Sequence, residues 1–112
     1  MAVLPNAADR IRLLNDNFRT TLVGGRMYMT AGVDALPLDT KARVLLAVQS
    51  FDKFTEDDDP HHEHDFGSFE IEGETYFFKI DYYAVDMAGG SEDPADPAKT
   101  ARVLTVMRAD EY

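Results

Sequence analysis

The sequence predicts an α+β fold: a small antiparallel sheet with two helices packed on one face. Apolar residues at helical spacing, at about residues 7–19 and 40–51, predict the two helices. Two alternating stretches joined at a glycine, at about residues 68–84, predict a β-hairpin. Because predicted strands outnumber helices and two of them are hairpin-linked, we expect the helices to cover one face of the sheet. The length fits one domain, residues 1–112.

The first half of the chain should supply both helices and one strand. Asn6 can cap the first helix, because its side-chain oxygen can accept from free amides of the first turn. The apolar positions of that helix are Ile11, Leu14 and Phe18. Residues 26–30 follow a glycine pair and predict a short strand. Asp39 is expected to cap the second helix, whose buried positions would be Val44, Leu45, Val48 and Phe51.

The second half should supply the rest of the sheet. Residues 52–65 are polar and acidic and contain a proline, which predicts a loop. The hairpin should turn at Gly73, and its second strand has two distinct faces. The expected buried face is Tyr76, Phe78, Ile80 and Tyr82, and the opposite face is Phe77, Lys79, Asp81 and Tyr83. Residues 88–97 predict a second loop, and residues 100–107 predict the last strand.

Negative charge is concentrated in residues 52–96. Fifteen of the 21 Asp and Glu residues lie there with two of the 11 Lys and Arg residues, which gives this segment −13 against −10 for the whole chain. Such a local field repels nucleic acid and attracts basic protein surfaces. We therefore expect a basic protein partner and no direct binding of nucleic acid.

Several classes of protein are disfavoured by what the sequence lacks. It has no cysteine, so it has no disulfide, no thiolate nucleophile and no Cys-ligated zinc. It shows no signal-peptide pattern and no apolar run of about 18 residues, so we expect a cytoplasmic protein without membrane contact. It has no glycine-rich phosphate-binding motif. These features favour a binding protein over an enzyme, and we expect no cofactor.

The histidine-rich part of the acidic segment, residues 57–65, offers an alternative. In an extended segment His62 and His64 would lie on the same side, and Asp65 could add an oxygen ligand. The spacing matches no helix-borne zinc motif. The alternative function is therefore a metal-dependent enzyme that uses this loop. A surface loop with incidental affinity for divalent metal explains the same residues.

Distinctive short motifs recur along almost the whole chain. They are residues 11–19 (IRLLNDNFR), 30–33 (TAGV), 59–60 (DP), 63–67 (EHDFG), 79–83 (KIDYY), 93–97 (DPADP) and 102–105 (RVLT). In these motifs the chain resembles a small bacterial family catalogued as domain of unknown function 3768. The sequence departs from the family pattern at His61-His62, where an aromatic residue and a glycine are expected. The resemblance implies no established activity. It implies a genomic setting that includes plasmids and phage-derived regions, and hence an anti-defence activity such as anti-CRISPR or anti-restriction.

An inhibitor of a nucleic-acid-binding complex needs carboxylates spaced along its surface, where they can occupy Lys and Arg sites that normally hold phosphates. The candidate partner-binding residues are Asp57, Asp58, Asp59, Glu63, Asp65, Glu70, Glu72, Glu74, Glu92, Asp93 and Asp96. We therefore predict a small acidic inhibitor that acts as a nucleic-acid mimic on a CRISPR effector or a defence nuclease. The competing interpretation is a solvated acidic face that keeps the protein soluble.

Overall fold

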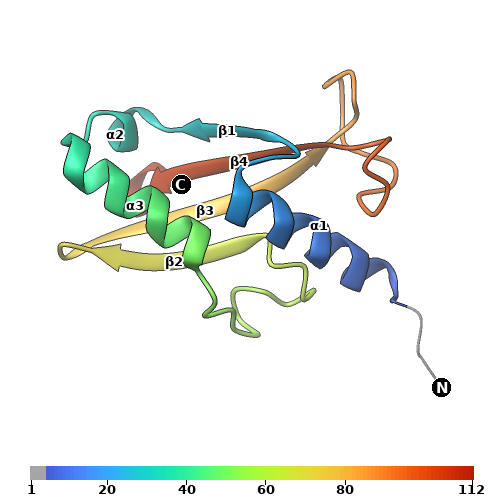
Figure 1. Ribbon diagram of the computed structural model, residues 1–112, viewed down its shortest axis with the longest axis horizontal. Helices are drawn as coiled ribbons and strands as arrows, with labels where there is room; N and C mark the ends of the chain where they lie inside the picture. Colours follow the sequence, from blue (N-terminus) through green and yellow to red (C-terminus); the bar gives the residue numbers. More distant parts are fainter. Residues whose placement is uncertain (1–4) are drawn as a thin grey trace.

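Four strands form one mixed sheet in the order β1-β4-β3-β2 in the computed structural model, which describes residues 5–112 (Figure 1). The strands are β1 (Arg26–Met29), β2 (Phe66–Ile71), β3 (Glu74–Tyr83) and β4 (Ala101–Arg108). The pairs β2–β3 and β3–β4 are antiparallel. The predicted α+β fold is therefore confirmed. The pairing of β1 with β4 is parallel. The sequence did not indicate this pairing, because the two strands are far apart in the chain and β4 enters the sheet between β1 and β3.

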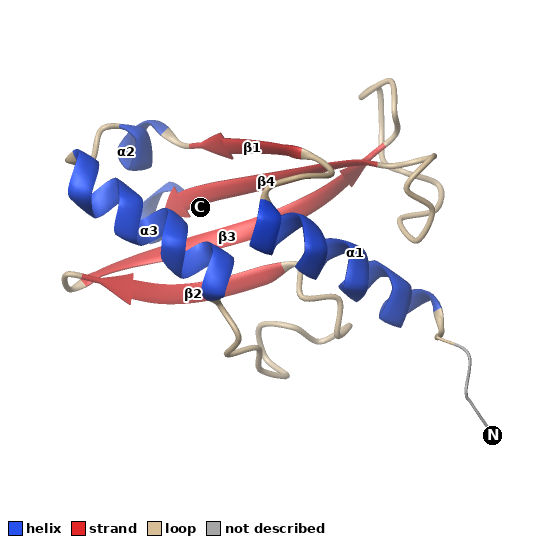
Figure 2. Cartoon of the chain, viewed as in Figure 1, coloured by secondary structure: helices blue, strands red, loops and turns tan. Residues whose placement is uncertain are grey.

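Both long helices lie over the same face of the sheet, as predicted (Figure 2). They are α1 (Ala7–Thr21) and α3 (Leu38–Ser50), and a short α2 (Ala31–Asp34) precedes α3. Asn6 caps α1, since its side chain accepts from the amide of Asp9 at 2.8 Å. The α2 turn was not predicted because four residues are too few to show a helical period. No helix in residues 5–112 has both the length and the apolar character needed to cross a bilayer.

The predicted cap of α3 was wrong. Pro37 occupies the N-cap position, and Asp39 lies in the first turn of the helix. A proline at the entrance loses no helical hydrogen bond, and a carboxylate in the first turn is favoured by the partial positive charge of the helix N-terminus. Asp39 therefore supports the helix through its charge rather than by capping.

The core lies between the two helices and the covered face of the sheet. The alternation predicted for β3 is confirmed, because Phe78 and Ile80 are fully buried beneath the helices. The other buried apolar residues of this cluster are Phe18, Val33, Val44, Val48, Tyr76, Leu104 and Val106. Tyr82 is partly buried and packs against the cluster. Neither α1 nor α3 lies over the other face of the sheet (Figure 2), although Val103 and Met107 on that face are buried. A 3-10 helix, η1 (Ala109–Glu111), follows β4.

The hairpin turn fixes the register of β2 on β3. Ile71 pairs with Glu74, which leaves a two-residue turn of Glu72 (φ 53°) and Gly73 (φ 82°). Two consecutive positive φ values define a type I′ turn, which suits the right-handed twist of the two strands. The predicted hairpin across Gly73 is confirmed. The same register places Phe66 opposite Lys79 at the far end of the hairpin.

Candidate partner-binding surface

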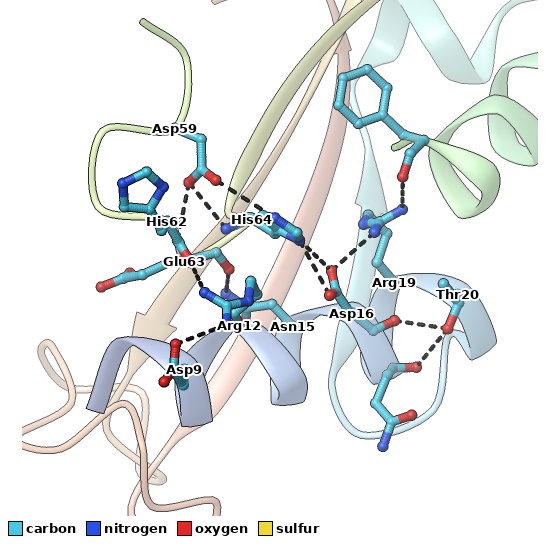
Figure 3. Close-up of polar contacts among 12 residues, drawn as sticks. Asp9, Arg12, Asn15, Asp16, Arg19, Thr20, Asp59, His62, Glu63 and His64 are labelled. Carbon is cyan, nitrogen blue, oxygen red and sulfur yellow. Dashed lines mark hydrogen bonds and ion pairs between the residues drawn. The ribbon is translucent and has the colours of Figure 1, made fainter. Parts of the chain in front are cut away.

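The acidic loop, residues 52–65, contains no helix or strand, yet α1 fastens it in place (Figure 3). The guanidinium of Arg12 donates to the carbonyl oxygen of His62 at 3.1 Å. The side-chain amide of Asn15 donates to the carbonyl oxygen of Glu63 at 2.9 Å. Figure 3 shows both α1 side chains directed toward the loop. A loop lacks the regular main-chain hydrogen bonds of a helix or strand, and these side-chain bonds to its carbonyl oxygens take their place. The loop therefore has a defined shape.

Asp59 and His64 hold the inside of the acidic loop. Asp59 is 3% exposed, and its carboxylate accepts from the amides of Glu63 at 3.0 Å and His64 at 3.1 Å. The His64 ring lies flat on Phe54, with centroids 3.7 Å apart. Its Nδ1 is 2.9 Å from an oxygen of Asp16, and its Nε2 is 3.8 Å from Asp59. Because the buried Asp59 carboxylate accepts from the loop's own amides, it is not available to a partner.

The start of the acidic loop is fixed by Arg19 of α1. This guanidinium is buried, and it donates to the carbonyl oxygens of Val48 at 2.9 Å and Phe51 at 3.0 Å. It also donates to Asp16 at 3.1 Å. A cation at these carbonyls satisfies the C-terminal end of α3 and complements its partial negative charge. One side chain therefore joins α1 to the point at which α3 gives way to the loop.

A buried polar network lies beneath Glu63. The Tyr82 hydroxyl donates to the Glu63 carboxylate at 2.8 Å and accepts from the Asn15 amide at 2.8 Å. Arg102 donates to the side-chain oxygen of Asn15 at 2.8 Å and to the main-chain carbonyl oxygen of Pro94. Burial raises the pKa of the Tyr82 hydroxyl, which therefore remains a donor, and burial lowers the pKa of Arg102. The half-buried Glu63 carboxylate is therefore engaged by Tyr82 within the protein.

An open groove of about 370 Å³ lies where the acidic loop meets the hairpin; we call it the acidic groove. Its carboxylates are Asp57, Asp58, Asp65 and Asp81, and its other lining residues are Pro60, His61, Phe66, Lys79, Ile80 and Tyr112. Lys79 is 3.1 Å from Asp81, so its charge is paired within the groove. Asp57 and Asp58 are exposed. The groove therefore presents an excess of negative charge beside aromatic side chains.

Asp65 is a carboxylate of the acidic groove whose pKa is raised by its surroundings. Burial raises its pKa above the ordinary value of 3.8, and the neighbouring carboxylates of Glu63 and Asp59 raise it further. The charged form of Asp65 is therefore held at a cost in free energy. A cation placed in the groove would offset that cost, which is the electrostatic behaviour expected of a binding residue.

The remaining predicted carboxylates lie outside the acidic groove. The residues Glu70, Glu72 and Glu74 are exposed near the hairpin turn, and Glu92, Asp93 and Asp96 belong to the loop that follows β3. In Figure 1 that loop lies at the opposite end of the sheet from the hairpin turn. Several are engaged locally: Glu72 pairs with Arg43 at 2.7 Å and Glu92 with Lys99 at 3.5 Å, while Asp93 and Asp96 accept from nearby amides. The predicted residues therefore form separate groups rather than one row.

The alternative ligands His62, His64 and Asp65 do not form a three-residue metal cluster in the described part of the chain, where no group of three or more such residues could hold an ion. His62 is exposed, and its φ of 57° lies in the left-handed region that favours glycine. The family resemblance leads one to expect glycine at this position, and the backbone has the conformation that a glycine would suit.

Two kinds of residue in this region do not stand out in the sequence. The sequence predicts Asp81 on the outward face of its strand but does not indicate that it lies near the acidic loop. The two-residue turn sets the register of the hairpin, and this register brings Asp81 beside the loop. Asn15 and Arg19 lie one and two turns beyond Ile11, on the buried face of α1. Polar residues at apolar positions were the available signal. Nothing in the sequence indicated that Tyr112 folds back onto Phe66 and Phe77.

These features define a small α+β protein with an acidic groove built on a hairpin and an anchored loop. Residues 29–111 match the family model described as protein of unknown function (DUF3768), so the chain belongs to that family. The expected family is thereby confirmed, and the motif at residues 11–19 lies outside the matched residues. Neither the curated proteins nor the solved structures gave a match to this chain.

Proposed function

We propose that this protein binds a basic surface of a nucleic-acid-handling complex and inhibits it by occupying the place of phosphates. The complex would be a CRISPR effector or another defence nuclease. The observation that carries the proposal is the acidic groove, in which Asp57, Asp58 and Asp65 lie together with Asp81. Carboxylates spaced on a rigid surface can engage Lys and Arg residues that otherwise hold phosphate oxygens.

Two further features support binding over mere solubility. The acidic loop is held by three side chains of α1, Arg12, Asn15 and Arg19, and the last two are buried. The carboxylates of the loop are therefore pre-organised and lose little freedom on binding. The groove also contains Phe66 and the exposed ring of Tyr112, which contact each other edge to face. Aromatic side chains inside a charged rim are typical anchors of protein interfaces.

The test is capture of partners from a bacterial lysate with the immobilised protein, followed by mass spectrometry and competition with duplex DNA. The wild type should retain a nucleic-acid-binding protein that DNA displaces. The Asp57→Lys/Asp58→Lys variant should lose it. An Asp34→Lys/Glu92→Lys variant changes net charge equally at exposed positions outside the groove, and it should retain the partner. Retention by the groove variant, or a partner that DNA does not displace, would contradict the proposal.

A further inference from the structure

The outer edge of β2 is unpaired and lies beside the acidic groove, which Phe66 helps to line. β2 is one of the two edge strands of the sheet, so one side of its backbone faces no other strand. The amide of Ile80 donates to the carbonyl oxygen of Asp65 at 2.8 Å, which fixes which residues of β2 bond to β3. By alternation, Gly67, Phe69 and Ile71 face β3, whereas the amides and carbonyls of Phe66, Ser68 and Glu70 point outward.

This edge carries few of the features that normally protect a sheet from adding a strand. β2 has the sequence Phe-Gly-Ser-Phe-Glu-Ile, with no proline and no lysine, and its register on β3 runs without a bulge. None of the outward main-chain groups of Phe66, Ser68 and Glu70 bonds to another group among residues 5–112. An extended chain can therefore pair with it as a fifth strand.

A groove of about 630 Å³ runs beside this edge; we call it the edge groove. It lies between β2 and the end of α3, and it is lined by Ser50, Phe51, Asp52, Ser68, Phe69 and Glu70, among others. Phe51 and Phe69 offer apolar surface for alternate side chains of an added strand. Asp52 and Glu70 are exposed carboxylates, and Lys53 is the cation that lines the same groove.

β2 connects the two grooves. Phe66, its first residue, lines the acidic groove, and Ser68 to Glu70 line the edge groove. From Phe66 to Glu70 the strand spans about 14 Å at roughly 3.4 Å per residue. An extended segment paired with this edge would pass the carboxylates of both grooves, so positive side chains on it would meet negative ones along its whole length.

We propose that β2 binds an extended basic segment of the partner protein by strand addition. This inference rests on the proposed function and names the part of the partner that is recognised. A second copy of this chain fits the edge less well, because each copy carries a formal charge of −10 and pairing of two β2 strands would bring their carboxylates together.

The test uses a short peptide of alternating lysine and threonine and the intact protein, with amide hydrogen exchange followed by NMR. The peptide should slow exchange at Ser68 and Glu70 by about tenfold or more, because their free amides become hydrogen-bonded. The same peptide methylated on every backbone nitrogen keeps its charge but has no main-chain donor on either edge, so it cannot pair and should not slow exchange. A glutamate-threonine peptide should not bind.

A protein variant supplies an independent readout. Ser68→Pro removes an outward amide without removing a bond to β3, so the sheet should persist while strand addition is lost; Ser68→Ala is its control. Equal effects of the methylated and unmethylated lysine peptides, or no binding of either, would overturn strand addition. The proposed function would still stand in that case if the Asp57→Lys/Asp58→Lys variant loses its partner. A dimer in sedimentation that Ser68→Pro converts to monomer would show that a second copy uses the edge, which also overturns the inference.

Discussion

Arg102 donates a 2.8 Å hydrogen bond to Asn15, and this bond joins β4 to α1 across 87 positions of the chain. Both side chains are buried, Asn15 at 0% and Arg102 at 3% exposure. Asn15 uses its other end to bind Glu63 and Tyr82. One amide therefore couples the sheet, the first helix and the acidic loop.

Replacing this amide should destabilise the protein. Asn15→Leu would remove the acceptor of Arg102 Nε and the donor to the Tyr82 hydroxyl. We expect a loss of roughly 3 kcal/mol in the free energy of unfolding. Asn17→Leu is the matched control, since Asn17 is exposed on the same helix. Urea titration of both variants gives the comparison. Equal stability of the two variants would mean that the network contributes little.

The two faces of β3 should differ in their tolerance of truncation. Phe78 and Ile80 are 0% and 3% exposed beneath the helices. Phe78→Ala or Ile80→Ala should lower the free energy of unfolding by roughly 2–5 kcal/mol, because each leaves a cavity. Lys79→Ala, on the open face, should cost much less. Similar losses on both faces in a denaturant titration would contradict a sheet covered on one side.

Gly67 is required by a close approach in the core. A Cβ at this position would lie 2.2 Å from the Phe78 ring and 2.8 Å from the Phe51 ring. Gly67→Ala should therefore cost about 1–3 kcal/mol through overpacking. Gly89→Ala, where a Cβ would meet nothing within 4 Å, should be nearly neutral. The thermal unfolding midpoints of the two variants test this. A lower midpoint for Gly67→Ala alone is expected, and equal midpoints would mean that the core accommodates the added methyl group.

Local patterns in the sequence were enough to predict most of the fold. Alternation in β3, the cap at Asn6 and the glycine turn at Gly73 are each set by neighbouring residues, so they could be read without tertiary information. The parallel pairing of β1 with β4 depends on where a distant strand enters the sheet, and no local pattern encodes that. The Asp39 cap failed because several residues near Pro37 were compatible with a helix start.

The candidate site was less predictable than the fold. Acidic composition identified Asp57, Asp58 and Asp65, but it could not separate them from Asp59, which is spent on the loop's own amides. That distinction depends on burial and on the direction of main-chain amides. Asp81 joins the groove only through the register of the hairpin. The charge of the sequence thus indicated an acidic surface. Which carboxylates line the groove depends on the packing of the loop and the hairpin.

The cost of charge at Asp65 should appear as a pH-dependent difference in stability. Its folded pKa is raised above the ordinary 3.8, so its titration favours the folded state below that value, and this contribution is lost as pH rises through the folded pKa. Asp65→Asn should therefore be more stable than the wild type at pH 7, and the difference should diminish as pH falls toward 3.8. Urea titrations across this range test it. Lower stability of the variant at pH 7 would contradict the claim that the charged form of Asp65 costs free energy in the folded protein.

The central claim is that the acidic groove drives association with a basic partner, and the salt dependence of affinity tests it most directly. Calorimetry of the wild type with its captured partner should show affinity falling by about tenfold or more from low to high salt, because ions screen exposed charges. The Asp57→Lys/Asp58→Lys variant should bind weakly at every salt concentration. An affinity that is independent of salt, with the variant binding as tightly as the wild type, would contradict the claim and point to an apolar interface.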